Sequence, residues 1–93
     1  SSDMAQNELT RASEQLESAA SETTVADASE RLTELAGQVT DIADGETKAD
    51  HGRIARIQAA LDELQSSVED DVAETVDDAR DELSTFREGL DGV

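Results

Sequence analysis

The stretch LDELQSSVEDDVAETV, from Leu61 to Val76, decides how many helices this chain forms. Apolar residues recur every three or four positions up to Val68, the spacing of one face of a helix. Val72 and Val76 then follow in two steps of four, so the stripe changes phase. A continuous helix absorbs such a slip as a stutter. Ser66, followed three residues later by an acid, instead resembles a helix start, and we predict a turn here.

Apolar stripes with helical spacing occur four times along the chain. They predict an all-α fold, an antiparallel four-helix bundle of two helical hairpins, in a single helical domain spanning residues 1–93. The alternative is three helices, the last running unbroken from about residue 50 to residue 90. The stripes outweigh the disorder that low aliphatic content and high charge favour. They comprise Ala5, Leu9, Ala12, Leu16 and Ala19; Val25, Ala28, Leu32, Leu35, Val39 and Ile42; Ile54, Ile57, Leu61, Leu64 and Val68; and Val72, Val76, Ala79, Leu83, Phe86 and Leu90.

The connections are marked by capping residues. Thr24 is the expected N-cap of the second helix, and Gly45 is suited to end that helix in a left-handed conformation. Residues 46–52 then form the one extended connecting loop. Asp50 is the expected cap of the third helix.

Composition limits the class of protein. The chain of 93 residues has 24 acidic against 7 basic side chains, a net charge of −17, and no cysteine. Disulfides and thiolate metal sites are thereby excluded. No apolar run approaches the roughly 18 residues of a membrane-spanning helix, and the opening SSDMAQNEL has neither the basic nor the apolar part of a signal peptide. We expect a cytoplasmic protein without membrane contact.

The acidic composition also indicates the salt concentration in which the protein works. Such a surface stays hydrated in concentrated salt, while its self-repulsion destabilises the compact state in dilute buffer. Lysine occurs once, at Lys48, and apolar positions rely on Ala and Val. This pattern predicts a halophilic protein that attracts cations nonspecifically.

The most acidic stretch, Val68–Glu82, has eight acids among its fifteen residues. Because an apolar stripe passes through it, the acids fall on the outer faces of a helix, and we interpret them as solvated. A calcium loop is the sharper hypothesis, and DIADGETKADHG offers Asp41, Asp44 and Gly45. However, Ala43 stands where a ligand is required. We therefore predict no metal-binding residues.

Enzymatic chemistry has little support. The sole histidine, His51, lies in the expected loop beside Asp50, and nothing supplies a nucleophile or an oxyanion hole at a recognisable spacing. We predict no catalytic residues, no cofactor-binding residues and no cofactor. Nucleic-acid binding lacks a basic patch and an aromatic platform, and mimicry of DNA by the carboxylates is a distant alternative.

The six arginines are interpreted as reducing local repulsion. Arg53 and Arg56 stand near the start of the third helix, beside Asp50. Asp27 and Arg31 have the spacing of a helical ion pair. Asp77 and Arg80 have the related spacing of three.

RIARIQAALDEL (Arg53–Leu64) and DDARDELSTFREGL (Asp77–Leu90) resemble a family of small, uncharacterised haloarchaeal proteins with a domain of unknown function. Its members share a Leu-x-x-Leu helix, an acidic or Gly-containing junction, and an Asp-Ala-Arg helix that closes with an aromatic residue and Arg. The resemblance implies no activity, so it assigns no functional residue. It agrees with the halophilic interpretation of the composition.

The sequence thus leaves the biological role unknown and favours a noncatalytic helical interaction or assembly protein of a halophilic cytoplasm. Its partner would be another protein or a second copy of the chain. The alternative is an accessory or regulatory subunit that needs a protein partner, and an enzyme is a distant third.

Salt should control stability. The Debye length shortens from about 10 Å at 0.1 M salt to about 3 Å at 1 M, which screens most repulsion between exposed carboxylates. We expect helicity and melting temperature to rise strongly with KCl, measured by circular dichroism. Mild acid should partly restore folding at low salt. A melting temperature indifferent to KCl between about 0.1 and 2 M would contradict the prediction.

Overall fold

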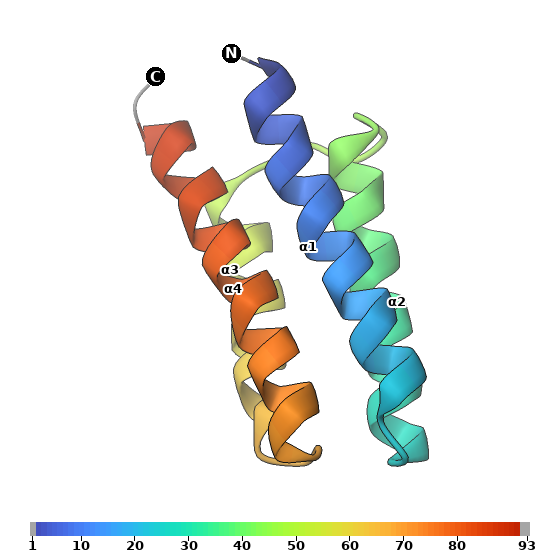
Figure 1. Cartoon of the computed structure of the whole chain (residues 1–93). Coiled ribbons are helices and arrows are strands. Elements are labelled where there is room, and N and C mark those ends of the chain that lie inside the picture. The colour runs from blue at the N-terminus through green and yellow to red at the C-terminus, as the bar shows by residue number, and fades with distance from the viewer. Residues whose placement is uncertain (1, 92–93) are drawn as a thin grey trace.

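The computed structural model describes the backbone of residues 2–91 and the side chains of residues 7–90. It contains helices α1 (Ser2–Glu22), α2 (Ala26–Ala43), α3 (His51–Gln65) and α4 (Asp70–Asp91). Figure 1 shows them side by side along one long axis, as the hairpins α1–α2 and α3–α4, with α1 and α4 in front. The predicted all-α, four-helix bundle is confirmed. The three-helix alternative is wrong, because the chain leaves α3 after Gln65.

The turn between α3 and α4 is built differently from the expected capping box. Ser66 closes α3, because its hydroxyl donates to the carbonyl of Glu63 at 2.9 Å. The Ser67 N–H donates to the carbonyl of Leu64 at 2.9 Å. Glu69 immediately precedes α4, and its carboxylate accepts from the first hairpin turn instead of from the serines.

The turn between α1 and α2 also differs from the prediction. Thr24 is not the N-cap; Val25 occupies that position in an extended conformation, without a side-chain cap. Since Val25 precedes the helix, it is 36% exposed and does not begin a buried stripe.

The loop between α2 and α3 follows the predicted chemistry. Gly45 has a φ of +82°, and its N–H donates to the carbonyl of Ile42 at 3.1 Å. The N–H of Glu46 donates to the carbonyl of Asp41 at 2.9 Å, which completes a Schellman motif. Asp50 caps α3 by accepting from the Arg53 N–H at 2.8 Å, as predicted.

The core lies between all four helices. Helix α1 packs against α2 and α4, and α4 packs against α3, while α2 and α3 touch least among the neighbouring pairs. The predicted stripes are mostly confirmed, although Leu64, Val68 and Leu90 are half-buried and Ala5 lies outside the described side chains. The core cluster contains Leu9, Ala12, Leu16, Ala19, Ala20, Leu32, Leu35, Ala36, Val39, Ile42, Ile54, Ile57, Leu61, Val72, Val76, Ala79, Leu83 and Phe86.

Buried polar groups join α1 to α2. Ser13 is buried, and its hydroxyl donates to the carbonyl of Ala36 at 3.2 Å and shares a hydrogen bond with Thr40 at 2.7 Å. Near the hairpin turn, the Ser29 hydroxyl donates to the carbonyl of Ala20 at 2.7 Å. Because buried polar groups are costly unless bonded, these pairs favour one register between the two helices.

Leu32 and Leu83, both fully buried, test the core. Replacing either with Ala should lower the free energy of unfolding by about 2–5 kcal/mol, measured by urea denaturation in concentrated KCl. Val25→Ala, at an exposed site, should change it by less than about 0.5 kcal/mol. Near-wild-type stability in both leucine variants would show that these helix faces are not packed as described.

Candidate functional site

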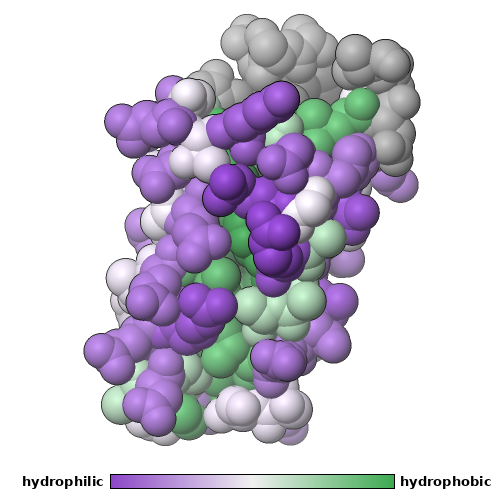
Figure 2. Space-filling model, turned by 180° about the vertical axis from the view of Figure 1, so that it is seen from behind, coloured by the Kyte–Doolittle hydropathy of each residue, from purple (hydrophilic) through white to green (hydrophobic). Residues whose placement is uncertain are grey.

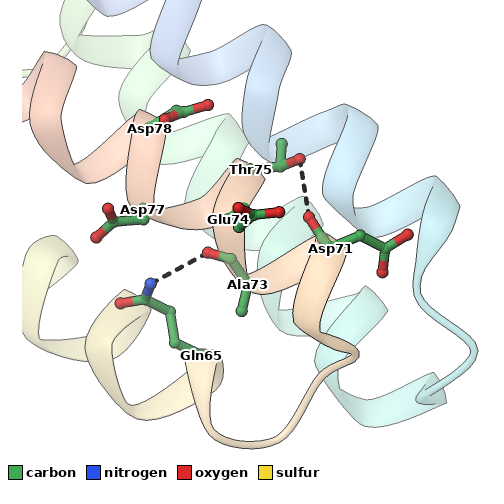
Figure 3. Close-up of a pocket in the computed structure, with 7 residues that line it drawn as sticks. All are labelled: Gln65, Asp71, Ala73, Glu74, Thr75, Asp77 and Asp78. Atoms are coloured by element: carbon green, nitrogen blue, oxygen red, sulfur yellow. Dashed lines mark hydrogen bonds between the residues drawn. The ribbon is translucent and has the colours of Figure 1, made fainter.

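The acidic stretch borders an open depression of about 620 Å³ on the first half of α4. Gln65 lines it together with Asp71, Ala73, Glu74, Thr75, Asp77 and Asp78. Figure 3 shows that its four carboxylates do not converge on a common point. Within residues 7–90, no group of three or more His, Cys, Asp or Glu side chains is placed to hold a metal ion. The depression therefore has the character of a solvated helix surface.

The stretch considered as a calcium-binding loop, residues 41–52, begins inside a helix. Asp41 is still within α2, and its carbonyl accepts from the N–H groups of Glu46 and Thr47. Asp44 is the C-cap of the same helix. An EF-hand requires these positions to wrap around the ion, which a helical backbone does not permit.

His51 was expected in the loop, and that placement is wrong. It is the first residue of α3 and is half-buried. Its Nδ1 atom accepts from Nε of Arg87 on α4 at 3.4 Å. The histidine therefore belongs to the contact between α3 and α4.

That contact continues along the whole hairpin as a polar seam that the sequence analysis missed. Gln58 donates to the carbonyl of Arg80 at 3.2 Å and accepts from Arg87 at 3.0 Å. Gln65 accepts from Arg80 at 2.7 Å and donates to the carbonyl of Ala73 at 3.1 Å. The two glutamines are seven residues apart, and so are the two arginines. This equal spacing is the sequence feature from which the contact between the glutamines and the arginines could have been predicted.

Most arginines have structural partners in the bundle. Arg80 lies 3.4 Å from Asp62 and 3.7 Å from Asp77, so the predicted pair with Asp77 is present. Arg11 joins α1 to α4 through Glu82 at 2.6 Å. Arg31 pairs with Glu34 at 3.4 Å; the predicted pair with Asp27 is wrong.

Arg53 and Arg56 differ from the others. Neither forms a direct ion pair with a side chain in the described part of the chain. Their charges act on the nearby Asp50: the Arg53 N–H and then the charges of Arg53 and Arg56 lower the pKa of the Asp50 carboxyl, as expected from their position beside it. Nε of Arg53 is buried and has no acceptor among the described residues. Gln58 and Gln65 face α4 in the polar seam. Because each residue advances a helix by about 100°, Arg53 and Arg56 lie on the side of α3 away from that seam.

The surface over α3 contains the longest stretch of the chain that lacks acidic side chains. Residues 51–61 form the longest run without Asp or Glu and contain two arginines. Figure 2, which views the molecule from behind, shows hydrophobic side chains in a strip between hydrophilic margins. We define the α2–α3 face by eight exposed or half-buried residues of the two helices: Arg31, Glu34 and Gln38 of α2, and Arg53, Arg56, Ala60, Glu63 and Leu64 of α3. It is the best candidate for a binding surface.

Comparison with protein families gives a match over residues 4–89 to the model of a family of unknown function, DUF7553. The chain belongs to DUF7553. The match covers nearly the whole bundle, whereas the expected resemblance lay mainly over residues 53–90. The family carries no assigned activity, so it transfers no functional residue.

The other comparisons add no relative of this DUF7553 chain. Neither the curated proteins nor the solved structures contain a significant match. Among the described helices, none is long and apolar enough to cross a membrane.

One carboxylate of the acidic stretch has specific partners. Glu69 Oε1 accepts from the Thr23 hydroxyl at 2.8 Å. Its Oε2 accepts from the N–H and the hydroxyl of Thr24 at 2.9 and 2.7 Å. The N–H of Thr24, then that of Glu69 itself and the two threonine hydroxyls lower the pKa of Glu69 from 4.5 to about 2. This carboxylate ties the two hairpin turns together at one end of the bundle.

Glu69→Gln should lower the melting temperature at neutral pH, because an amide cannot accept on both of its heteroatoms. Since folding lowers this pKa, the stabilisation is fully present above about pH 4.5 and is lost as the pH falls toward 2. The difference between wild type and variant should therefore shrink over that interval, measured by thermal melts in concentrated KCl. Glu74→Gln, an equal charge change at an exposed site of α4, should not destabilise. Equal melting curves for the two variants would show that the Glu69 carboxylate does not stabilise the contact between the two hairpin turns.

Proposed function

We propose that this protein is a noncatalytic helical interaction or assembly protein of a halophilic cytoplasm, and that it binds a protein partner through the α2–α3 face. The observation that carries the proposal is an apolar strip beside residues 51–61, the longest run without Asp or Glu, on a molecule with a net charge of −17. Elsewhere exposed carboxylates occur on all four helices. A partner that is itself acidic meets two arginines and no acid along residues 51–61.

Two physical terms support binding there. Apolar side chains in the strip lose contact with water on association, which contributes about 25 cal/mol per Å² of apolar surface buried. In addition, Arg53 and Arg56 form no direct ion pair within the described chain. Besides their attraction to Asp50, their N–H donors have capacity for a carboxylate on another molecule. Concentrated salt screens long-range repulsion but leaves apolar contact intact.

An accessory or regulatory subunit would use the same face and differ only in its partner. Enzyme function has less support, because the depression on α4 holds diverging carboxylates and His51 contacts Arg87. DNA mimicry would require carboxylates gathered on one face, whereas exposed acids here are spread over four helices.

Affinity capture in concentrated KCl tests the proposal with two matched variants. Ala60→Gln adds bulk on the α2–α3 face, and Ser18→Gln adds similar bulk at an exposed site of α1. Tagged wild type and tagged Ser18→Gln should retain the same protein in the same amount per bait molecule. That protein can be another chain or an untagged copy of this one. Ala60→Gln should retain about tenfold less, the factor that 1.4 kcal/mol represents. Melting curves must first show that both variants fold.

Capture that does not distinguish the two variants, or no retained protein at all, would refute the proposed binding face.

A further inference from the structure

Helix α3 has its charges separated along its length. Arg53 and Arg56 occupy its first half, Asp62 and Glu63 its second, and Ala59–Ala60 lie between them. Arg56 and Glu63, which carry opposite charges, are therefore equally far along the helix from the midpoint between the two alanines. Two copies of α3 placed antiparallel would bring Arg56 of each opposite Glu63 of the other.

The bundle presents these residues on one side. His51, Gln58 and Gln65 recur every seven residues and contact α4. Arg56, Ala60 and Glu63 follow each other by four and three, so they share a different face of the helix. Arg56 and Glu63 are exposed, and neither makes an ion pair with a described residue. The charge of Arg56 acts on Asp50, but with no direct ion pair both side chains can still bind an opposite charge on another molecule.

We propose that the α2–α3 face binds a second copy of this chain, with the two α3 helices antiparallel and a two-fold axis passing between Ala59 and Ala60. This deepens the proposed function and rests on it, naming the partner of the same face. Each dimer contains the Arg56–Glu63 pair twice, as isologous symmetry requires. The small side chain of Ala60 permits the helix axes to approach to about 8–10 Å.

The size of the face is adequate for a stable dimer. The Cα atoms extend 39 Å along the bundle and 20 Å across it, so one long side can supply the roughly 800 Å² per partner of a standard interface. The loose contact of α2 with α3 leaves the strip between them accessible to the other copy. Because each copy has a net charge of −17, the dimer should form only when salt screens the remaining carboxylates.

Light scattering after size-exclusion chromatography, in about 2 M KCl to screen the charge, tests the proposal. Wild type should have twice the chain mass of 9.9 kDa. Arg56→Glu and Glu63→Arg should each weaken the dimer at least about tenfold, because like charges then face each other. Lys48→Glu, with the same charge change as Arg56→Glu but in the connecting loop, should remain dimeric. Glu63→Arg reduces the net negative charge, so general repulsion alone predicts the opposite result.

Restoring the complementary charges should restore the dimer. The double variant R56E/E63R should be dimeric again. An equal mixture of the two single variants should also dimerise, since each Glu of one copy then faces an Arg of the other. Recovery in both experiments supports the antiparallel contact.

A wild type that is folded and monomeric in concentrated KCl would overturn the proposal, as would a dimer insensitive to these charge exchanges. If the wild type is monomeric but capture retains another protein that depends on Ala60, self-association fails while the proposed function stands. If capture also fails to depend on Ala60, both fail.

Discussion

Mutual repulsion among 24 carboxylates on 93 residues is the constraint on which the rest of this structure depends. The core that opposes it consists of aliphatic side chains and alanines, with Phe86 as its one aromatic member. Apolar burial is nondirectional, so it does not by itself choose which helices become neighbours. Directional contacts at the helix seams contribute that choice. Arg11 and Arg80 link helices at positions where an acid or amide lies across the seam.

The contacts between neighbouring helices differ in extent, and the α2–α3 face lies over the weakest of them. Buried hydroxyls join α1 to α2, and glutamines and arginines join α3 to α4. Both hairpins also have short turns, which Glu69 ties together. Helices α2 and α3 are instead joined by the longest connection, and they pack loosely. The apolar strip between them is consequently less covered by the chain itself, and Arg53 and Arg56 are left beside it.

Local pattern was sufficient to predict the helices, because their stripes, the φ of Gly45 and the Asp50 cap each depend on a few neighbouring residues. It failed where the deciding contact is distant in sequence. Thr24 was assigned as a cap, but Glu69, 45 residues later, accepts its N–H. The Gln58 and Gln65 contacts with α4 likewise require knowledge of which helix lies opposite. The acid-poor run of residues 51–61 is visible in the sequence, whereas its position beside an apolar strip needed the fold.

The two-fold axis between Ala59 and Ala60 is the central claim, and a distance measurement between copies tests it most directly. The chain has no cysteine, so a single spin label can be attached at Ala59→Cys and, in a separate protein, at Ser18→Cys. In concentrated KCl, the account predicts a short distance between labels at position 59, because both lie near the axis, and a clearly longer one at position 18. A short distance at position 18 would contradict it, as would no measurable distance at position 59 in a labelled protein that light scattering shows to be dimeric.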